Sequence, residues 1–268
     1  MDITPDEIMV ACIARQLHDG DVVAQGLATP LVAAGYLLAR YTHAPHLYIA
    51  SAIGQGMCRQ PAPLSISQIE SLWLDRALTN IGFARAATEI LPSLRPKEFF
   101  RPAQVDAQGN INNIAFGKDY QHPRLRLPGT GGIPDVTTFL NDIYLYVPRH
   151  SKVTFVSRLD FCAGLGHNEA RTQGRGPVYL ISDLGQFDFE NGHMRLVSFH
   201  PGSSIEKIQS HTGFPLEIAS NVVETPLPTT EKIDLLRNEI DRGGIRKLET
   251  LSGSARRALL HQILAAGG

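Results

Sequence analysis

The sequence predicts an α/β protein with an open, mostly parallel sheet and flanking helices. In the first 51 residues a helix, a strand, a second helix and a second strand alternate with short links, as they do in parallel sheets with crossover helices. The later strands are short and are separated by glycine-rich segments. The 268 residues are 43% hydrophobic, a composition that supports a sizeable core and excludes a fibrous or disordered chain.

The first elements follow from local signals. Thr4 and Glu7 form a capping box around Pro5, which predicts a helix that ends at Gly20. The next predicted elements are a strand over 21–26, a helix from Thr29 to about residue 40, and a buried strand over 46–51.

The rest of the chain continues the alternation after a loop. Residues 53–63 hold two glycines, two prolines and no acidic residue, which predicts that loop. Predicted helices then lie near 67–79, 82–91, 203–211 (starting at Ser203), 230–240 and 254–266, and predicted strands at 97–101, 143–148, 153–157, 178–183 and 194–199. We assign residues 1–240 to one domain and 241–268 to a helical carboxyl-terminal extension.

Charge and cysteine usage exclude several classes of function. The 25 Lys and Arg nearly balance the 26 Asp and Glu, so the net charge of -1 provides no field for binding nucleic acid or an anionic membrane. The start of the chain lacks a charged leader before an apolar core, and no apolar run reaches the length of a membrane span. Cys12, Cys58 and Cys162 match neither a disulfide framework nor a metal site. We expect a cytoplasmic protein with reduced thiols and no bound metal.

The segment from Pro128 to Pro134 gathers backbone N–H groups without side-chain obstruction. Gly129, Gly131 and Gly132 give it the character of a loop that hugs a phosphate, a thioester oxygen or a pantetheine chain. An ordinary tight turn is the competing interpretation. The spacing required for dinucleotide binding is missing, which argues against a nicotinamide cofactor.

Four further side chains are candidates with structural alternatives. Asn110 and Asn112 either direct amides at a ligand or close a turn through bonds to the backbone, and the turn is the favoured interpretation. His167, in the glycine-rich stretch 163–167, is a candidate proton-transfer residue or a plain loop histidine. Cys58 is a possible nucleophile, although an inert thiol is the better interpretation.

Five stretches in this order resemble the β subunit of class I CoA-transferases, and that of glutaconate CoA-transferase above all. They are 22–31 (VVAQGLATPL), 104–112 (QVDAQGNIN), 122–132 (HPRLRLPGTGG), 180–185 (LISDLG) with 187–189 (FDF), and 199–202 (FHPG) with 211–214 (HTGF). The resemblance covers about residues 4–240. It implies an open α/β fold of the CoA-transferase type, a homologous α subunit in a heterodimer or heterotetramer, and an acyl-CoA bound between the two chains.

The resemblance also implies roles for individual residues. Gly26, Asn110, Asn112 and the loop from Gly129 to Gly132 would bind the acyl-CoA, which is the substrate, so no separate cofactor is expected.

In transferases of this type a β-chain glutamate attacks the acyl-CoA and carries CoA as a thioester. Counting without gaps from Pro45, that position is Ala52, with Ser51 beside it, and no Asp or Glu lies between Asp21 and Glu70.

The missing glutamate leaves three hypotheses. The leading one is a β-like subunit that hydrolyses a carbon–carbon bond of a keto-acyl-CoA, or decarboxylates a dicarboxyl-acyl-CoA, without a glutamyl thioester; Ser51, the Ala52 position and His167 are its candidate catalytic positions. The second is an authentic CoA-transferase with its nucleophile elsewhere. The third is a non-catalytic chain that stabilises its partner.

Overall fold

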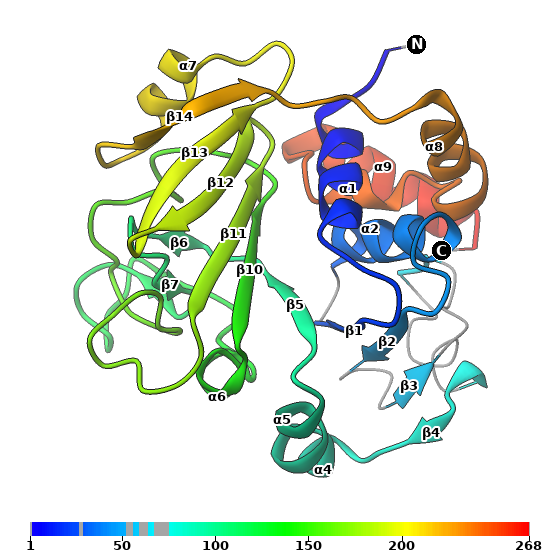
Figure 1. Ribbon diagram of the computed structural model, residues 1–268, viewed down its shortest axis with the longest axis horizontal. Coiled ribbons are helices and arrows are strands. Elements are labelled where there is room, and N and C mark those ends of the chain that lie inside the picture. Colours follow the sequence, from blue (N-terminus) through cyan, green and yellow to red (C-terminus); the bar gives the residue numbers. More distant parts are fainter. Residues whose placement is uncertain (1, 27–28, 52–55, 59–63, 67–74, 268) are drawn as a thin grey trace. The chain divides into compact units, whose positions relative to one another are not determined.

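A computed structural model describes residues 2–26, 29–51, 56–58, 64–66 and 75–267. The chain forms two compact units (Figure 1). The first unit comprises residues 1–98 and 226–268, and the second comprises residues 99–225. The strand β5 (Lys97–Phe100) contributes its first half to one unit and its second half to the other. Each unit is described on its own below.

The first unit contains a mixed sheet with parallel strands at its centre. Its strands are β1 (Val22–Gln25), β2 (Tyr48–Ser51), β3 (Gly56–Cys58), β4 (Thr79–Asn80) and the start of β5. They pair in the order β4-β3-β2-β1-β5. β1 is parallel to both β2 and β5, whereas β3 runs antiparallel to β2 and to β4. This arrangement confirms the predicted α/β class, with antiparallel strands added beyond the parallel centre.

Two amino-terminal helices build much of the core of this unit. α1 (Pro5–Arg15) begins as predicted, because the Glu7 carboxylate accepts a hydrogen bond of 3.0 Å from the Thr4 amide. It ends five residues before the predicted stop at Gly20. α2 (Pro30–Tyr41) packs closely on α1, where Gly35 leaves space for Ile13. A Cβ at Gly35 would lie 2.5 Å from the Ile13 side chain, so only glycine allows this contact.

The carboxyl-terminal segment belongs to the first unit. It contains α8 (Thr230–Leu235), a π-helical turn over Leu236–Ile240, a short 3-10 helix over Ile245–Leu248, and α9 (Gly253–Ala265). Glu249 accepts a hydrogen bond of 2.9 Å from the amide of Leu31 in the first turn of α2. The proposed boundary between residues 240 and 241 stays a prediction.

The second unit contains the strands that lie beyond β5 in the order of the sheet. Its strands β10 (Asp142–Val147), β11 (Gly176–Ser182), β12 (Gly185–Glu190), β13 (His193–Phe199) and β14 (Glu217–Glu224) follow β5 in that order. β5, β10 and β11 are parallel, β12 is antiparallel to both of its neighbours, and β14 is parallel to β13. Short two-stranded ladders join β6 (Gln104–Val105) to β7 (Ile111–Asn112), and β8 (Ala115–Phe116) to β9 (Leu125–Arg126).

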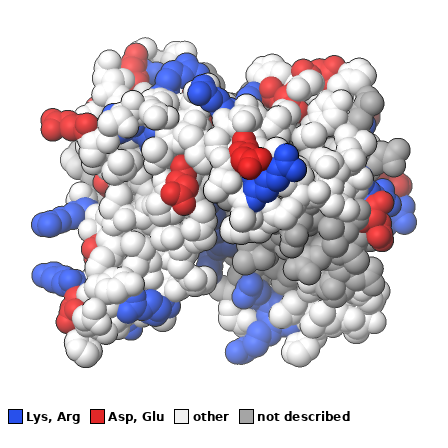
Figure 2. All heavy atoms as spheres, turned by 90° about the horizontal axis from the view of Figure 1, so that it is seen from below, with Lys and Arg blue, Asp and Glu red and all other residues white. Residues whose placement is uncertain are grey.

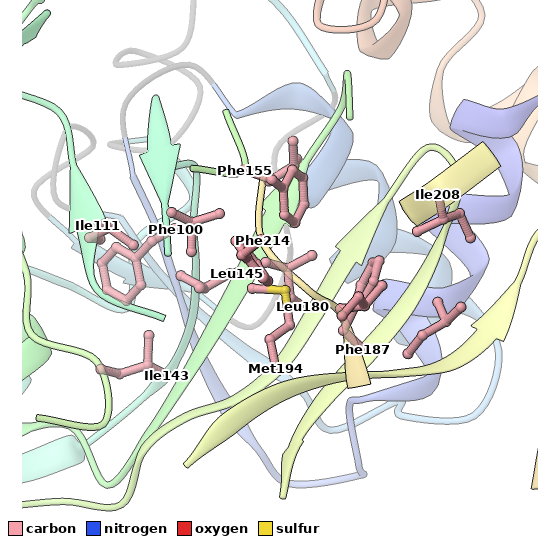
Figure 3. Close-up of a cluster of buried hydrophobic side chains, with 14 of the residues drawn as sticks. Phe100, Ile111, Ile143, Leu145, Phe155, Leu180, Phe187, Met194, Ile208 and Phe214 are labelled. Carbon is pink, nitrogen blue, oxygen red and sulfur yellow. The ribbon is translucent and has the colours of Figure 1, made fainter. Parts of the chain in front are cut away.

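Aromatic and aliphatic side chains fill the core of the second unit (Figure 3). Leu145, Leu180 and Phe187 come from three successive strands and are completely buried. Phe155 joins them from a loop, and Ile208 comes from α7 (Ile205–His211). Burial of side chains of this size contributes about 1.5–3 kcal/mol each to folding.

Several sequence predictions differ from the structure. Residues 153–157 do not form the predicted strand. A turn there places Phe155 in the core, and Phe155 pairs with Val105 through one isolated bridge. The helix predicted to start at Ser203 is capped by Ser204, whose hydroxyl accepts from the Lys207 amide. The predicted loop 53–63 contains the strand β3, and its remaining residues lie outside the described part.

Other elements are shifted from their predicted places or were not predicted. The prediction over 67–79 falls on residues of which only 75–79 are described. The helix predicted at 82–91 consists of α4 (Phe83–Arg85), a π-helical turn over Ala86–Ile90 and α5 (Leu91–Leu94). The sequence did not predict β12, β14, or α6 (Ile133–Phe139).

The surface carries both signs of charge. On the face shown in Figure 2, Lys and Arg side chains alternate with Asp and Glu over the described residues. None of the helices in the described part is long and apolar enough to cross a membrane.

Candidate functional site

The carboxyl end of β1 is a topological switch in the sheet of the first unit. The chain leaves β1 for β2 on one side, and later returns as β5 on the other side. In open α/β sheets, ligands bind outside the carboxyl ends of the strands at such a point. Gly26, a predicted substrate-binding residue, directly follows the last residue of β1.

The strand that leads to the expected glutamate position ends at this edge. Ser51 is the last residue of β2 and pairs with Gln25 of β1. The next residue, Ala52, lies outside the described residues. The structure therefore brings the backbone of Ser51 to the end of β1, and the catalytic roles considered for Ser51 and Ala52 stay predictions.

A glutamate on β5 lies on the other side of β1. Glu98 pairs with Ala24, and its Oε1 lies 3.6 Å from where a Cβ on Gly26 would be. The side chain is half-buried. Burial raises the pKa of Glu98 from 4.5 to about 7, and among the described residues no cation offsets this effect.

Gln25 presents a second polar group at the same strand end. Its side chain is 8% exposed, and among the residues that the structure describes no group donates a hydrogen bond to its buried Oε1. A buried acceptor without a partner costs about 1–3 kcal/mol, so such groups in native proteins call for an explanation, such as a ligand.

A small apolar pocket lies on this sheet beside β2 and β3. Its volume of about 40 Å³ is enough for a small apolar group. Its walls come from β2, β3, the residue after β4 and the helical segment 83–94, and the residues are Ala50, Gly56, Met57, Ile81, Ala86, Ile90, Leu91 and Leu94. Ala50 pairs with Ala24, so both side chains point to the same face of the sheet.

The glycine loop belongs to the second unit. Gly129 and Gly131 have φ of 109° and 52°, and Cβ atoms built there would meet nothing within 4 Å. Gly132 leads directly into α6. Across the described residues, no amide from Gly129 to Gly132 donates a hydrogen bond inside the protein. The loop thus has free donors and open space, as expected of a binding loop.

The asparagine turn, in contrast, uses its polar groups internally. Asn112 is fully buried; its Nδ2 donates to Gln104 Oε1 at 2.7 Å and to the Ala115 carbonyl at 2.9 Å. The Oδ1 of Asn110 accepts from the Gly166 amide at 2.8 Å, and its Nδ2 donates to the Asp106 carboxylate. Because these groups already have partners, the geometry corresponds to the turn interpretation, and neither amide is directed at open space.

His167 lies near this turn and is also held by internal contacts. Its Nε2 hydrogen-bonds to the Pro177 carbonyl at 2.7 Å, and its ring packs 5.6 Å from that of Phe189. Its amide donates to Gln108, which ties the glycine-rich stretch to the turn. This bond occupies only one ring nitrogen, so a proton-transfer role for His167 would use Nδ1, and that role stays a prediction.

The thiols and the possible metal ligands are the remaining candidates. Cys58 is buried on β3, and burial raises its pKa to about 12, which fits the inert-thiol interpretation. All three cysteines are free. Among the described residues, no three His, Cys, Asp or Glu side chains are placed to hold a metal ion.

Comparison with known proteins decides the family. Residues 7–211, more than half of the chain, match the model of the family described as Coenzyme A transferase. The chain belongs to the coenzyme A transferase family. This membership confirms the resemblance found in the five sequence stretches.

The proteins similar to this chain are named for three different reactions. A glutaconate CoA-transferase chain of Acidaminococcus fermentans is 30% identical over 259 residues, covering 90% of this chain and 93% of the relative. The cholesterol ring-cleaving hydrolase IpdB subunit of Mycobacterium tuberculosis is 29% identical over 259 residues, covering 93% of this chain and 99% of the relative. The crystal structure of the decarboxylase AibA/AibB superimposes with a TM-score of 0.80 at 31% identity, over 93% of this chain and 100% of that chain.

Gln25 and Glu98 were not among the candidates predicted from the sequence. Glu98 is the only acidic residue of β5, whose pattern Lys-Glu-Phe-Phe contains two buried aromatic residues. A charged residue in a buried strand is a signal that is visible in the sequence. What the sequence does not show is that β5 lies beside β1.

Proposed function

We propose that this member of the coenzyme A transferase family is the β-like subunit of a heteromeric enzyme that breaks a carbon–carbon bond of an acyl-CoA. The reaction is hydrolysis of a keto-acyl-CoA or decarboxylation of a dicarboxyl-acyl-CoA, and it forms no glutamyl thioester on this chain. The partner is a homologous α subunit, and CoA enters only as part of the substrate. A cytoplasmic location stays part of the proposal.

The observation that carries this proposal is the absence of any Asp or Glu between Asp21 and Glu70 in the sequence. This interval contains β2 and the Ala52 position, where the resemblance places the nucleophilic carboxylate. Alanine has no nucleophilic atom, and a serine such as Ser51 needs an adjacent base to become one.

The two bond-breaking reactions need little from the protein beyond polarisation and proton transfer. Loss of CO₂, or of an acyl group after water has added to a ketone, leaves an electron pair that delocalises into the thioester carbonyl as an enolate. Backbone N–H donors stabilise such an oxyanion, and one donor typically changes the rate by about 10²–10³-fold. The free amides from Gly129 to Gly132 suit this role.

CoA transfer remains the second candidate function, because the relative named glutaconate CoA-transferase is 30% identical over most of both chains. Transfer would require a nucleophile outside β2 or on the α subunit. The two functions differ in their products, since transfer conserves every carbon–carbon bond.

The deciding experiment uses the complex of this chain with its α subunit. The complex is incubated with glutaconyl-CoA, or with 2-oxocyclohexanecarboxyl-CoA, and in a parallel reaction with glutaconyl-CoA plus acetate. Release of CO₂ or ring opening, without acetyl-CoA formation, supports the proposal. Acetyl-CoA together with a hydroxylamine-sensitive acidic residue on this chain, identified by mass spectrometry, would refute it.

A substitution in the glycine loop distinguishes the two enzyme hypotheses from the third hypothesis, in which this chain only stabilises its partner. Gly131→Trp fills the space in front of the free amides while leaving the cores of both units untouched. Loss of turnover in a complex that still assembles assigns the loop to the site. Unchanged turnover would favour the non-catalytic chain. Gly20→Trp, at another open position with positive φ, is the control for a bulky residue in this strained backbone conformation.

A further inference from the structure

We propose that Glu98 is the acid/base group that returns a proton to the acyl carbon after the carbon–carbon bond breaks. This inference rests on the proposed function and adds to it the residue that moves the proton. It assigns a role to a side chain on β5, whereas the family resemblance directs attention to β2. Three features support it: the strand register, the surroundings of the carboxylate and the chemistry of enolates.

The strand register puts Glu98 on the same face of the sheet as Ala50 of β2. Glu98 and Ala50 both pair with Ala24, on opposite sides of β1. Directly paired residues of parallel strands point to the same face. The Cα atoms of Glu98 and Ala50 are about 9–10 Å apart, which is two strand spacings. Glu98 therefore shares a face with the strand that leads to the expected nucleophile position.

The neighbours of Glu98 on β1 and β2 are small. Ala24 and Gly26 occupy β1 and its end, and Gly26 approaches the Oε1 of Glu98 without a side chain between them. Ala50 borders the apolar pocket on the next strand. Small side chains beside a carboxylate at the switch point leave room for a substrate where larger residues would cover the acid.

The carboxylate has no structural role that would explain its presence. Within the described part of the chain, Glu98 makes no ion pair or hydrogen bond, and burial is the cause of its altered pKa. The adjacent Lys97 does not serve Glu98, because its Nζ pairs with Asp21 at 2.7 Å and donates to the Gln16 carbonyl. A half-buried acid without a partner destabilises the fold when it is ionised, so its retention calls for a function.

The proton balance fits both reactions of the proposed function. When the bond to the departing carbon breaks, its electron pair moves into the thioester as an enolate. The protonated Glu98 then forms the new C–H bond at the enolate carbon and its own O–H bond breaks, which leaves a carboxylate. That carboxylate regains a proton from water before the next turnover. A pKa near 7 keeps much of Glu98 protonated at neutral pH, as a general acid requires.

The test compares Glu98→Gln with the wild-type complex in D₂O, again with glutaconyl-CoA and 2-oxocyclohexanecarboxyl-CoA as probes. Glutamine keeps the shape of the side chain and removes the ionisable proton, so the variant should fold. We expect kcat to fall by about 10²–10⁴-fold while KM changes little, because proton transfer is lost and binding is retained. Glu98→Asp should recover part of the rate, and Glu239→Gln, an exposed acid of the same unit, should change nothing.

A second readout separates a proton-transfer role from a structural one. In wild type the pH profile of kcat should fall at high pH with an ionisation near 7, and in Glu98→Gln that ionisation should disappear. Wild-type turnover and an unchanged pH profile in Glu98→Gln would overturn the inference while leaving the proposed function intact. If instead the wild-type complex only transfers CoA, and mass spectrometry finds a thioester on Glu98, both proposals fail and Glu98 is the relocated nucleophile.

Discussion

The guanidinium of Arg246 donates a hydrogen bond of 2.9 Å to the Glu7 carboxylate, across 239 residues of sequence. Both side chains are 2% exposed. Arg246 also donates to Asp241 at 2.8 Å, and its Nε contacts Asp6 at 2.8 Å as an ion pair. These contacts join the 3-10 helix over Ile245–Leu248 to the first turn of α1.

The ionisation of Glu7 depends on the cations in this cluster. Burial alone would raise the pKa of Glu7, but the hydrogen bonds from Arg237 and from the Thr4 amide, and the charge of Arg246, lower it to about 2. A buried carboxylate held by two cations stays ionised, whereas one that loses its cation is left without compensation.

Arg246→Ala should lower the free energy of unfolding by about 3–5 kcal/mol, because it leaves three buried carboxylates without their shared cation. Urea unfolding monitored by circular dichroism measures the change. Arg242→Ala removes an exposed arginine, 72% accessible, from a pair with Glu239 and should cost less than about 1 kcal/mol. Equal costs for the two variants would contradict the buried network.

Gly166→Ala should destabilise the second unit by about 3 kcal/mol or more. A Cβ at Gly166 would lie 2.2 Å from the Gln108 carbonyl oxygen and 2.4 Å from the Asn110 amide nitrogen, and both are backbone atoms that cannot move aside cheaply. Thermal unfolding reports the loss. Gly82→Ala, which meets nothing within 4 Å, should unfold at the wild-type temperature. A stable Gly166→Ala variant would mean that the asparagine turn is not packed as described.

The stability of the protein should fall as pH rises through the titration of Glu98. Its pKa in the folded state, about 7, exceeds the usual 4.5, so its contribution is fully present below pH 4.5 and is lost as pH rises past 7. The loss is at most about 3 kcal/mol. Unfolding free energies measured in urea from pH 4.5 to 8.5 should show this decline in wild type, and Glu98→Gln should show less of it. Parallel curves for both proteins would disprove the raised pKa.

His150 should remain neutral in mildly acidic solution. Its ring stacks 3.6 Å from that of Phe155 and hydrogen-bonds to the hydroxyls of Ser182 and Thr212. Burial, followed by the charge of His211, lowers the pKa of His150 from 6.5 to about 3. Its stabilising effect is therefore complete above pH 6.5 and is lost as pH falls through 3. Ring nitrogen chemical shifts of selectively labelled protein should stay constant from pH 7 to 5, and a midpoint near 6 would refute the prediction.

Local signals in the sequence predicted the elements that have strong caps or strong periodicity. α1 begins at Pro5 because the Thr4 and Glu7 spacing encodes a cap within four residues. α2 begins at Pro30, because proline suits the first helical position. β14 escaped detection because most of its residues are exposed, so it lacks the apolar pattern of a buried strand. Phe155 was assigned to a strand since it is apolar, but its place in the core comes from a turn.

For the candidate site residues, too, the sequence predicted the features that depend on local signals and left open those that depend on tertiary packing. The sequence marked the segment with Gly129 and Gly131 as a loop of unobstructed backbone N–H groups, because a glycine cluster between elements is a local signal. The structure adds that both glycines have positive φ. It left open whether Asn110 and Asn112 face a ligand. That question depends on Gln104, Gly166 and other partners, whose proximity comes from the packing of separate loops.

The order of residues by itself determined the α/β class and the membership of the coenzyme A transferase family. The alanine at the position of the nucleophilic carboxylate stays a prediction from the sequence. Only the tertiary structure revealed that Glu98 lies across β1 from β2, with its Oε1 next to Gly26. The physical reason is that strand pairing joins segments far apart in the chain, and the order of strands in a sheet depends on how helices pack on it. No local pattern around residue 98 records which strand will be its neighbour.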